Sequence, residues 1–175
     1  MRFITLSQPW PWALCHAGMD VLNMKREFTG VIGERIGIHA GKQWDDNTTL
    51  WAGAYDVPFV HTGMTDDDGN TVSEDPFVMG RGDNGRWKRQ PFSAVVAVAT
   101  ITGSHEDFRC EFVSDSGKCS AWAMSGTVTD DNDYKPMWHW ELADVRPLTE
   151  PVPAKGRQGL WIPDAEIVEA VEAQL

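Results

Sequence analysis

Long apolar runs and signals for export are missing from this sequence. Its 175 residues contain no stretch near the roughly 20 apolar residues that a membrane-spanning helix needs. The N-terminus reaches Gln8 and two prolines too early for a secretory signal peptide. We therefore expect a cytoplasmic protein with no membrane contact. The length suits a single domain, residues 1–175, large enough to bury its own core.

Basic residues are also scarce. The chain has 15 lysines and arginines against 26 acidic residues, and its net charge is -11. A protein that wraps duplex DNA needs a broad basic face, because its affinity comes from releasing counterions from many phosphates. That class is excluded. Residues 1–42 nevertheless carry a net charge of +2, so the N-terminal part could hold one nucleotide or a short flipped-out segment.

Cysteine is limited to Cys15, Cys110 and Cys119. Three cysteines cannot all pair, and their spacing matches no familiar zinc motif. We expect these cysteines to behave as small apolar residues and to stay reduced in a reducing compartment. His105 and His139 could in principle join Cys110 and Cys119 in a site, but nothing in the spacing favours it. The sequence therefore predicts no metal and no cofactor.

The pattern of apolar residues predicts strands separated irregularly, with few helices. A helix capped by Ser7 and stopped by Gly18 should follow the first strand, and another should start at Pro163 and Asp164. Residues 43–90 look like an acidic insertion, with a short helix over 48–55. These features predict an α+β fold, a mixed β-barrel of five to six strands with a helix after the first strand and a C-terminal helix. The expected strands are 3–6, 19–25, 35–39, 92–101, 137–145 and 159–162.

Short motifs near both ends of the chain resemble one family. They are the Gln8-Pro9-Trp10 opening, the helix ending in Gly18, the strand from Ile36 to Lys42, and the closing run of Trp140, Val145-Arg146-Pro147-Leu148 and Gly159-Leu160-Trp161. Together they resemble the ASCH family of the PUA-like superfamily, in its small single-domain bacterial and phage versions. The likeness covers roughly the chain outside 43–90 and 104–133. It implies a PUA-like pseudo-barrel whose cleft, across the superfamily, receives RNA, modified bases or nucleosides.

The sequence departs from the charged signature of that family, which is glycine, any residue, lysine, two residues, glutamate, any residue, arginine. Counted from Gln8-Pro9-Trp10, the four positions fall at Ala17, Met19, Leu22 and Met24. Relatives resembling acetylcytidine amidohydrolases use the lysine, and a threonine at the glutamate position, in catalysis. A thioether and a methyl group cannot exchange protons at neutral pH, so the likeness implies no such activity here. A register shifted by one residue would instead place Asp20, Asn23 and Lys25 in the three charged positions.

The candidate ligand contacts surround this region. The stripe Met19, Leu22 and Met24 is either barrel core or the apolar floor of a cleft that binds an aromatic ring. Lys25 and Arg26 are either a solvated pair or a clamp for phosphate or carboxylate. Tryptophans at the cleft could stack on bases, and the start of the first helix could bind a phosphate. The predicted ligand-binding set is Ser7, Gln8, Trp10, Met19, Leu22, Met24, Lys25, Arg26, His39, Lys42 and Arg157.

Three functions fit these residues. The favoured one is a non-catalytic module that binds RNA or a modified nucleotide, with a single-stranded or flipped-out base in the barrel cleft. The second is a hydrolase or nuclease acting on nucleosides or RNA, with proton transfer by one of His39, Asp20, Glu27 or Lys25. The third is an acidic decoy that occupies a basic partner protein through the clusters Asp66-Asp67-Asp68 and Asp130, Asp131 and Asp133.

Overall fold

The computed structural model describes residues 1–45, 78–81, 87–89, 91–112 and 118–175. Within them, two α-helices and a 3-10 helix accompany the strands. The helices are α1 (Trp10–His16), η2 (Asp107–Phe112) and α3 (Ala165–Glu172). The strands are β1 (Arg2–Gln8), β2 (Val21–Met24), β3 (Arg35–Trp44), β4 (Val78–Arg81), β5 (Trp87–Arg89), β6 (Ala94–Glu106), β7 (Thr127–Val128), β8 (Tyr134–Lys135), β9 (Trp138–Pro153) and β10 (Leu160–Trp161).

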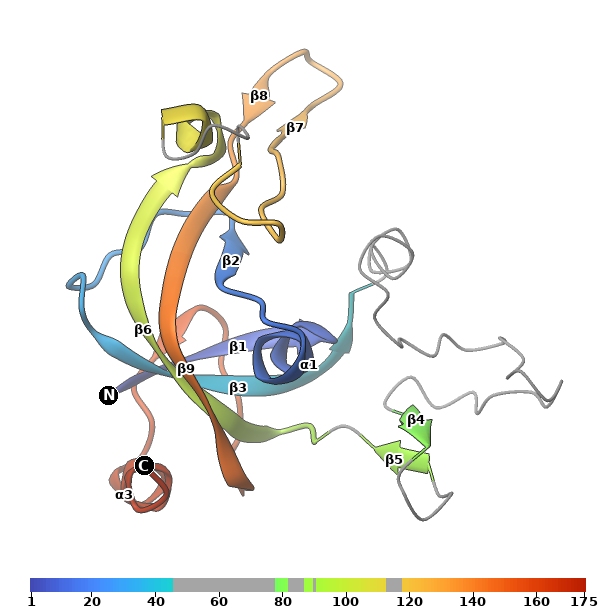
Figure 1. The fold of residues 1–175 in the computed structure, drawn as a ribbon. Helices are drawn as coiled ribbons and strands as arrows, with labels where there is room; N and C mark the ends of the chain where they lie inside the picture. The colour runs from blue at the N-terminus through green and yellow to red at the C-terminus, as the bar shows by residue number, and fades with distance from the viewer. Residues whose placement is uncertain (46–77, 82–86, 90, 113–117) are drawn as a thin grey trace, which may run out of the picture.

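Six strands form one curled sheet in the order β10-β1-β3-β6-β9-β2. The pair β1 and β3 is parallel, and the other neighbours are antiparallel. Figure 1 shows the long strands β6 and β9 bending together while β1 and β3 cross beneath them. This half-barrel, with one helix after the first strand and another at the C-terminus, confirms the predicted fold class.

The two faces of the sheet bury different side chains because residues alternate along each strand. The inner face carries Ile4, Leu6 and Ile38, and α1 packs on it through Ala13 and Leu14. The outer face carries a second cluster of buried residues, which joins the sheet to β10 and α3. Its members are Phe3, Val95, Val98, Trp161 and Val171.

Strand β6 lies at the centre of the sheet. Residues 94–99 are all buried, and they contribute to both core clusters. The predicted run of apolar residues is therefore a central strand, as expected. Gly37 on the neighbouring β3 is required for close packing, because a Cβ there would come within 2.4 Å of the Phe3 ring. The glycine in this short predicted strand thus makes room for an aromatic side chain.

Several predicted element ends were wrong, and β3 and β6 extend to Trp44 and Glu106, beyond the predicted ends at 39 and 101. Ser7 belongs to β1, and Pro9 precedes α1 with no side-chain cap, so Ser7 does not cap the helix. The prediction also ended the strand before Arg146-Pro147-Leu148, whereas β9 continues to Pro153. Pro147 is tolerated in β9 because the pairing of β9 with β2 ends at Glu141, so this part of β9 is no longer bonded to β2. The register between β6 and β9 also shifts near Ala97, the partner of Pro147.

The predicted insertion lies mostly outside the described residues, including the helix expected over 48–55. Its described part is a small two-stranded sheet of β4 and β5. Among the residues that the structure describes, no helix is both long and apolar enough to cross a membrane.

Candidate functional site: a methionine-lined cleft and a cationic groove

A small cleft of about 240 Å³ opens on the inner face, between α1 and β2. Four of the seven methionines in the sequence line it. Met19 and Leu22 are almost fully buried, and Met24 is half-buried. The predicted stripe is therefore both barrel core and cleft floor. The described residues that line it are Leu6, Trp10, Met19, Leu22, Asn23, Met24, Lys25, Asp45, Met124 and Met137.

Asn23 holds the far wall of the cleft in place. Its Nδ2 donates to the carbonyl of Trp122 at 2.9 Å, and its Oδ1 accepts from the backbone N–H of Met124 at 2.8 Å. Strand β2 is in turn fixed by pairing with β9, with Asn23 opposite His139. One amide side chain thus ties a segment that has little regular structure to the sheet.

Polar groups are few in the cleft and come from separate segments. Trp10 donates its indole N–H to Asp45 Oδ2 at 2.8 Å. Lys25 is exposed and contributes a positive charge to the lining. Among the residues that the structure describes, the cleft therefore combines apolar walls with one ammonium group, one carboxylate and one side-chain amide.

Arg26 lies next to the cleft but does not line it. The side chain is exposed, and the backbone carbonyl accepts the indole N–H of buried Trp140 at 2.8 Å. Trp140 packs edge-on against Phe28, with ring centroids 5.0 Å apart. These contacts fix the chain that carries Lys25 and Arg26 as it leaves β2.

The remaining predicted residues lie around a different depression, on the outer face of β1 and β3. This groove measures about 720 Å³ and contains the cations Lys42, Lys155 and Arg157, and the described residues of its lining include no carboxylate. Arg157 also lies over the Trp161 ring, 6.0 Å from its centroid. The lining is Thr5, Leu6, Ser7, His39, Gly41, Lys42, Gln43, Ser93, Lys155, Gly156, Arg157, Gln158 and Gly159.

The sheet therefore divides the predicted ligand-binding set between two depressions. Trp10, Met19, Leu22, Met24 and Lys25 line the cleft. Ser7, His39, Lys42 and Arg157 line the groove. Only Leu6, at the edge between them, borders both. The expectation that all these residues share one rim was drawn from strand order, and strand order does not reveal which face a side chain occupies.

Gln8 does not offer a group to a ligand at the start of the helix. Its side chain is fully buried, and its Nε2 donates to the carbonyls of Gly41 at 3.3 Å and Pro91 at 3.0 Å. The amide instead joins β1 to β3 and to the chain entering β6. The phosphate site predicted at this helix start was therefore wrong for Gln8.

His39 is buried in the wall of the groove, with 2% of its surface exposed. Its Nε2 donates to the carbonyl of Ala154 at 3.0 Å, while Nδ1 has no partner. Burial lowers the pKa of this imidazole below its ordinary 6.5, against the smaller opposing effect of the Ala154 carbonyl. Burial therefore disfavours the charged form of His39, and its Nε2 is engaged by the backbone.

This burial predicts a pH dependence of stability. Because the folded state binds a proton less readily than the unfolded chain, acidification through about pH 6.5 favours unfolding. We expect the unfolding free energy to fall more steeply in the wild type than in His39→Gln as the pH drops from about 7.5 to 5.5. Urea titrations across this range measure the difference. Equal slopes for the two proteins would show that His39 is protonated as easily in the fold as in the unfolded chain.

Several residues that line the cleft escaped the sequence prediction. Asp45, Met124 and Met137 reach the cleft from segments far from β2 in the sequence. The available signal was the presence of Met124 and Met137 at the two ends of an otherwise mostly polar stretch, residues 124–137. The group of His105, Cys110, Cys119 and His139, which the sequence analysis named but did not favour, has its ligand atoms within 4.8 Å of one another. Cys15 lies apart, with a pKa raised by burial to about 11.

The arrangement of strands is that of known ASCH structures. The crystal structure of ASCH from Zymomonas mobilis aligns with a TM-score of 0.51 and 12% identity, over 98% of this chain and 93% of that one. Two mutants of the same protein, a serine-to-alanine and a tyrosine-to-phenylalanine substitution, align with the same TM-score of 0.51 and identity of 12%, over 99% and 98% of this chain and 96% of each of theirs. No protein-family model and no curated protein sequence matches the chain. The protein thus has an ASCH-like fold.

Proposed function

We propose that this protein binds RNA or a modified nucleotide, with a single base inserted in the methionine-lined cleft. The observation that carries the proposal is the cleft itself, with apolar walls and a few polar groups. A nucleobase has the matching character, two apolar faces and a hydrogen-bonding edge. The volume of the cleft, about 240 Å³, lies below the roughly 300–1,000 Å³ of sites that bind drug-sized ligands. One ring therefore fits the space better than a whole dinucleotide.

The walls supply the binding energy in this proposal. Methionine sulfur makes favourable contacts with aromatic rings, and its flexible chain adapts to their shape. Stacking of a base on Trp10 would add about 1–3 kcal/mol. Asp45, which accepts the Trp10 indole N–H, also contributes its carboxylate to the lining of the cleft.

The charges place the phosphate outside the cleft. Lys25 is exposed beside it, and Arg26 follows directly. An ammonium and a guanidinium at adjacent positions can bind the phosphate of a nucleotide whose base is inserted. The three cations of the groove form a separate positive surface, suited to the backbone of a longer strand.

We further propose that binding is not accompanied by catalysis. The floor positions Met19 and Leu22 are apolar and buried, and they offer no nucleophile and no proton-transfer group. The cytoplasm is the expected location, because the free thiols of all three cysteines persist in a reducing compartment.

Titration of nucleosides, nucleotides and short single-stranded oligonucleotides tests this function. The double variant Lys25→Ala/Arg26→Ala should weaken nucleotide binding about tenfold, and nucleoside binding much less, because it removes the phosphate contact. The variant Lys42→Ala/Lys155→Ala is the matched control, since it removes two charges from the groove on the other face. It should leave mononucleotide binding unchanged.

Two results would contradict the proposal. One is equal loss of mononucleotide binding in the cleft and groove variants, which would mean that only the net charge matters. The other is turnover of an acylated nucleoside or of RNA by the wild type, which would identify a hydrolase or nuclease.

A further inference from the structure

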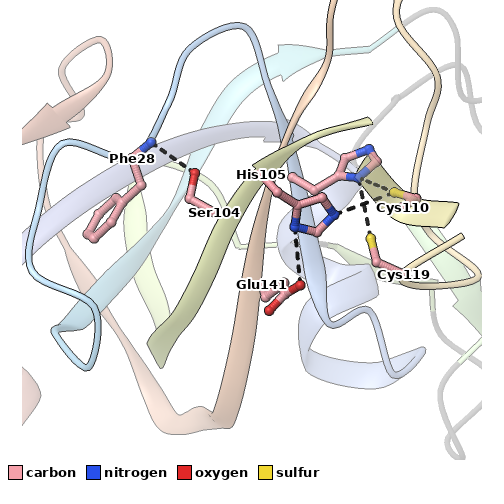
Figure 2. Close-up of polar contacts among 7 residues, drawn as sticks. Phe28, Ser104, His105, Cys110, Cys119 and Glu141 are labelled. Atoms are coloured by element: carbon pink, nitrogen blue, oxygen red, sulfur yellow. Dashed lines mark hydrogen bonds and ion pairs between the residues drawn. The ribbon is translucent and has the colours of Figure 1, made fainter. Parts of the chain in front are cut away.

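Two histidines and two cysteines converge beside the cleft. His105 in β6 lies directly opposite His139 in β9, and their rings meet edge to face at 5.3 Å. Cys110 comes from η2, and Cys119 from the segment that leads to the cleft wall. Figure 2 shows the two sulfurs beside His105, with Glu141 on the opposite side of that ring. Four donors of the kinds that bind transition metals therefore occupy one place.

We propose that these four residues bind one zinc ion. Cys110 Sγ lies 3.4 Å from His105 Nε2 and 3.1 Å from His139 Nδ1, and Cys119 Sγ lies 3.3 Å from His139 Nδ1. A tetrahedral zinc ion with Zn–S of about 2.3 Å and Zn–N of about 2.0–2.1 Å places its sulfur and nitrogen ligands about 3.6 Å apart. The three sulfur–nitrogen distances differ from this spacing by 0.2–0.5 Å, and all four donor atoms lie within 4.8 Å of one another.

The other nitrogen of each histidine is already engaged. His105 Nδ1 lies 3.2 Å from a carboxylate oxygen of Glu141, and His139 Nε2 donates to the carbonyl of Met124 at 2.8 Å. Each partner fixes the ring so that the unprotonated nitrogen faces the sulfurs. Metal-binding histidines in proteins have this same arrangement, a carboxylate or carbonyl orienting the ring from behind.

The donor set selects the metal and the role. Two thiolates and two imidazoles in tetrahedral arrangement favour Zn²⁺ over the oxygen-seeking ions. Two thiolates also balance the charge of the ion, which suits a place where Cys110 and His139 are 3% and 1% exposed. All four positions are filled by side chains, so the site has the closed form of a structural zinc rather than the open form of a catalytic one.

Zinc at this position would join three parts of the fold. It would link the ends of β6 and β9 to η2 and to the segment from Cys119 to Met124. Met124 lines the cleft and is held to His139 through its carbonyl. The free energy of zinc binding therefore adds to the stability of one cleft wall. Zinc binding by this cluster does not depend on what the cleft holds.

The test uses the full chain, purified with a reducing agent, stripped by a chelator and titrated with Co²⁺ and then Zn²⁺. We expect one ion per chain, the intense visible bands of tetrahedral cobalt with a thiolate charge-transfer band, and displacement of cobalt by zinc. Cys119→Ser is the primary variant, because Cys119 is only half-buried and its loss leaves the core intact. It should abolish the charge-transfer contribution of one thiolate and lower zinc affinity more than 100-fold. Cys15→Ser is the matched control and should bind like the wild type.

A second variant separates a zinc site from mere packing of the four side chains. Glu141→Gln keeps the shape of the residue but removes the charge behind His105, and it should weaken zinc binding about 10- to 100-fold. Failure of the reduced wild type to bind cobalt or zinc would overturn the inference. So would equal zinc loss in Cys15→Ser, or a Cys110–Cys119 disulfide that persists in the protein isolated from a reducing cytoplasm.

Discussion

Replacement of Met24 by tryptophan is expected to reduce nucleoside affinity at least tenfold, the largest effect on nucleoside binding that we predict. Met24 is half-buried in the lining of a cleft of about 240 Å³, so an indole at this position fills the space that a base would occupy. Because base stacking is worth about 1–3 kcal/mol, its loss corresponds to about 5- to 150-fold in affinity. Isothermal titration with nucleosides measures the change.

Two further variants control this experiment. Met24→Leu keeps the apolar floor and should bind within about threefold of the wild type, because such exchanges conserve volume. Val31→Trp adds an indole at a position that is 75% exposed and outside the cleft lining, and it should have no effect. Undiminished binding in Met24→Trp, with the variant folded, would place the ligand elsewhere.

The largest effect on stability is expected at Trp140. This side chain is 4% exposed, packs edge-on against Phe28 and donates to the Arg26 carbonyl. Trp140→Ala should lower the free energy of unfolding by about 3–5 kcal/mol, through lost burial and the cavity left behind. Trp140→Phe retains an aromatic ring and should cost about 1–2 kcal/mol, mostly the lost hydrogen bond.

Urea unfolding at constant zinc concentration measures both variants. A cost below about 1 kcal/mol for Trp140→Ala would mean that the ring is not part of the packed core. Because Arg26 and Lys25 are carried by the same segment, Trp140→Phe should also weaken nucleotide binding slightly while nucleoside binding stays near that of the wild type.

The sequence was sufficient for the architecture of the sheet. Apolar, β-branched residues at 94–101 predicted the central strand, and Gly18, with a φ of 68°, ends the first helix as its position suggested. The floor residues Met19, Leu22 and Met24 were also placed correctly beside one another. These features are local, because propensity and alternation along a few residues determine them.

Features that depend on register between distant strands could not be predicted. His105 and His139 are 34 positions apart in the sequence and meet only because β6 and β9 pair there. The separation of Cys110 from Cys119 matches no common zinc motif, so nothing in the spacing favoured a site formed by these residues. Met124 lies in no helix or strand, and two hydrogen bonds of the Asn23 side chain hold its segment at the cleft.

The position of the base can be measured through the methionine methyl groups. In protein labelled with ¹³C at the methionine methyls, and assigned by single Met→Leu substitutions, addition of the tightest-binding nucleoside should shift the signals of Met19, Met24, Met124 and Met137. These are the methionines of the cleft lining, and ring currents act only over short distances. The signal of Met1, which packs against the outer-face cluster, should stay in place. Unchanged signals from all four cleft methionines at saturation would contradict insertion of a base between α1 and β2.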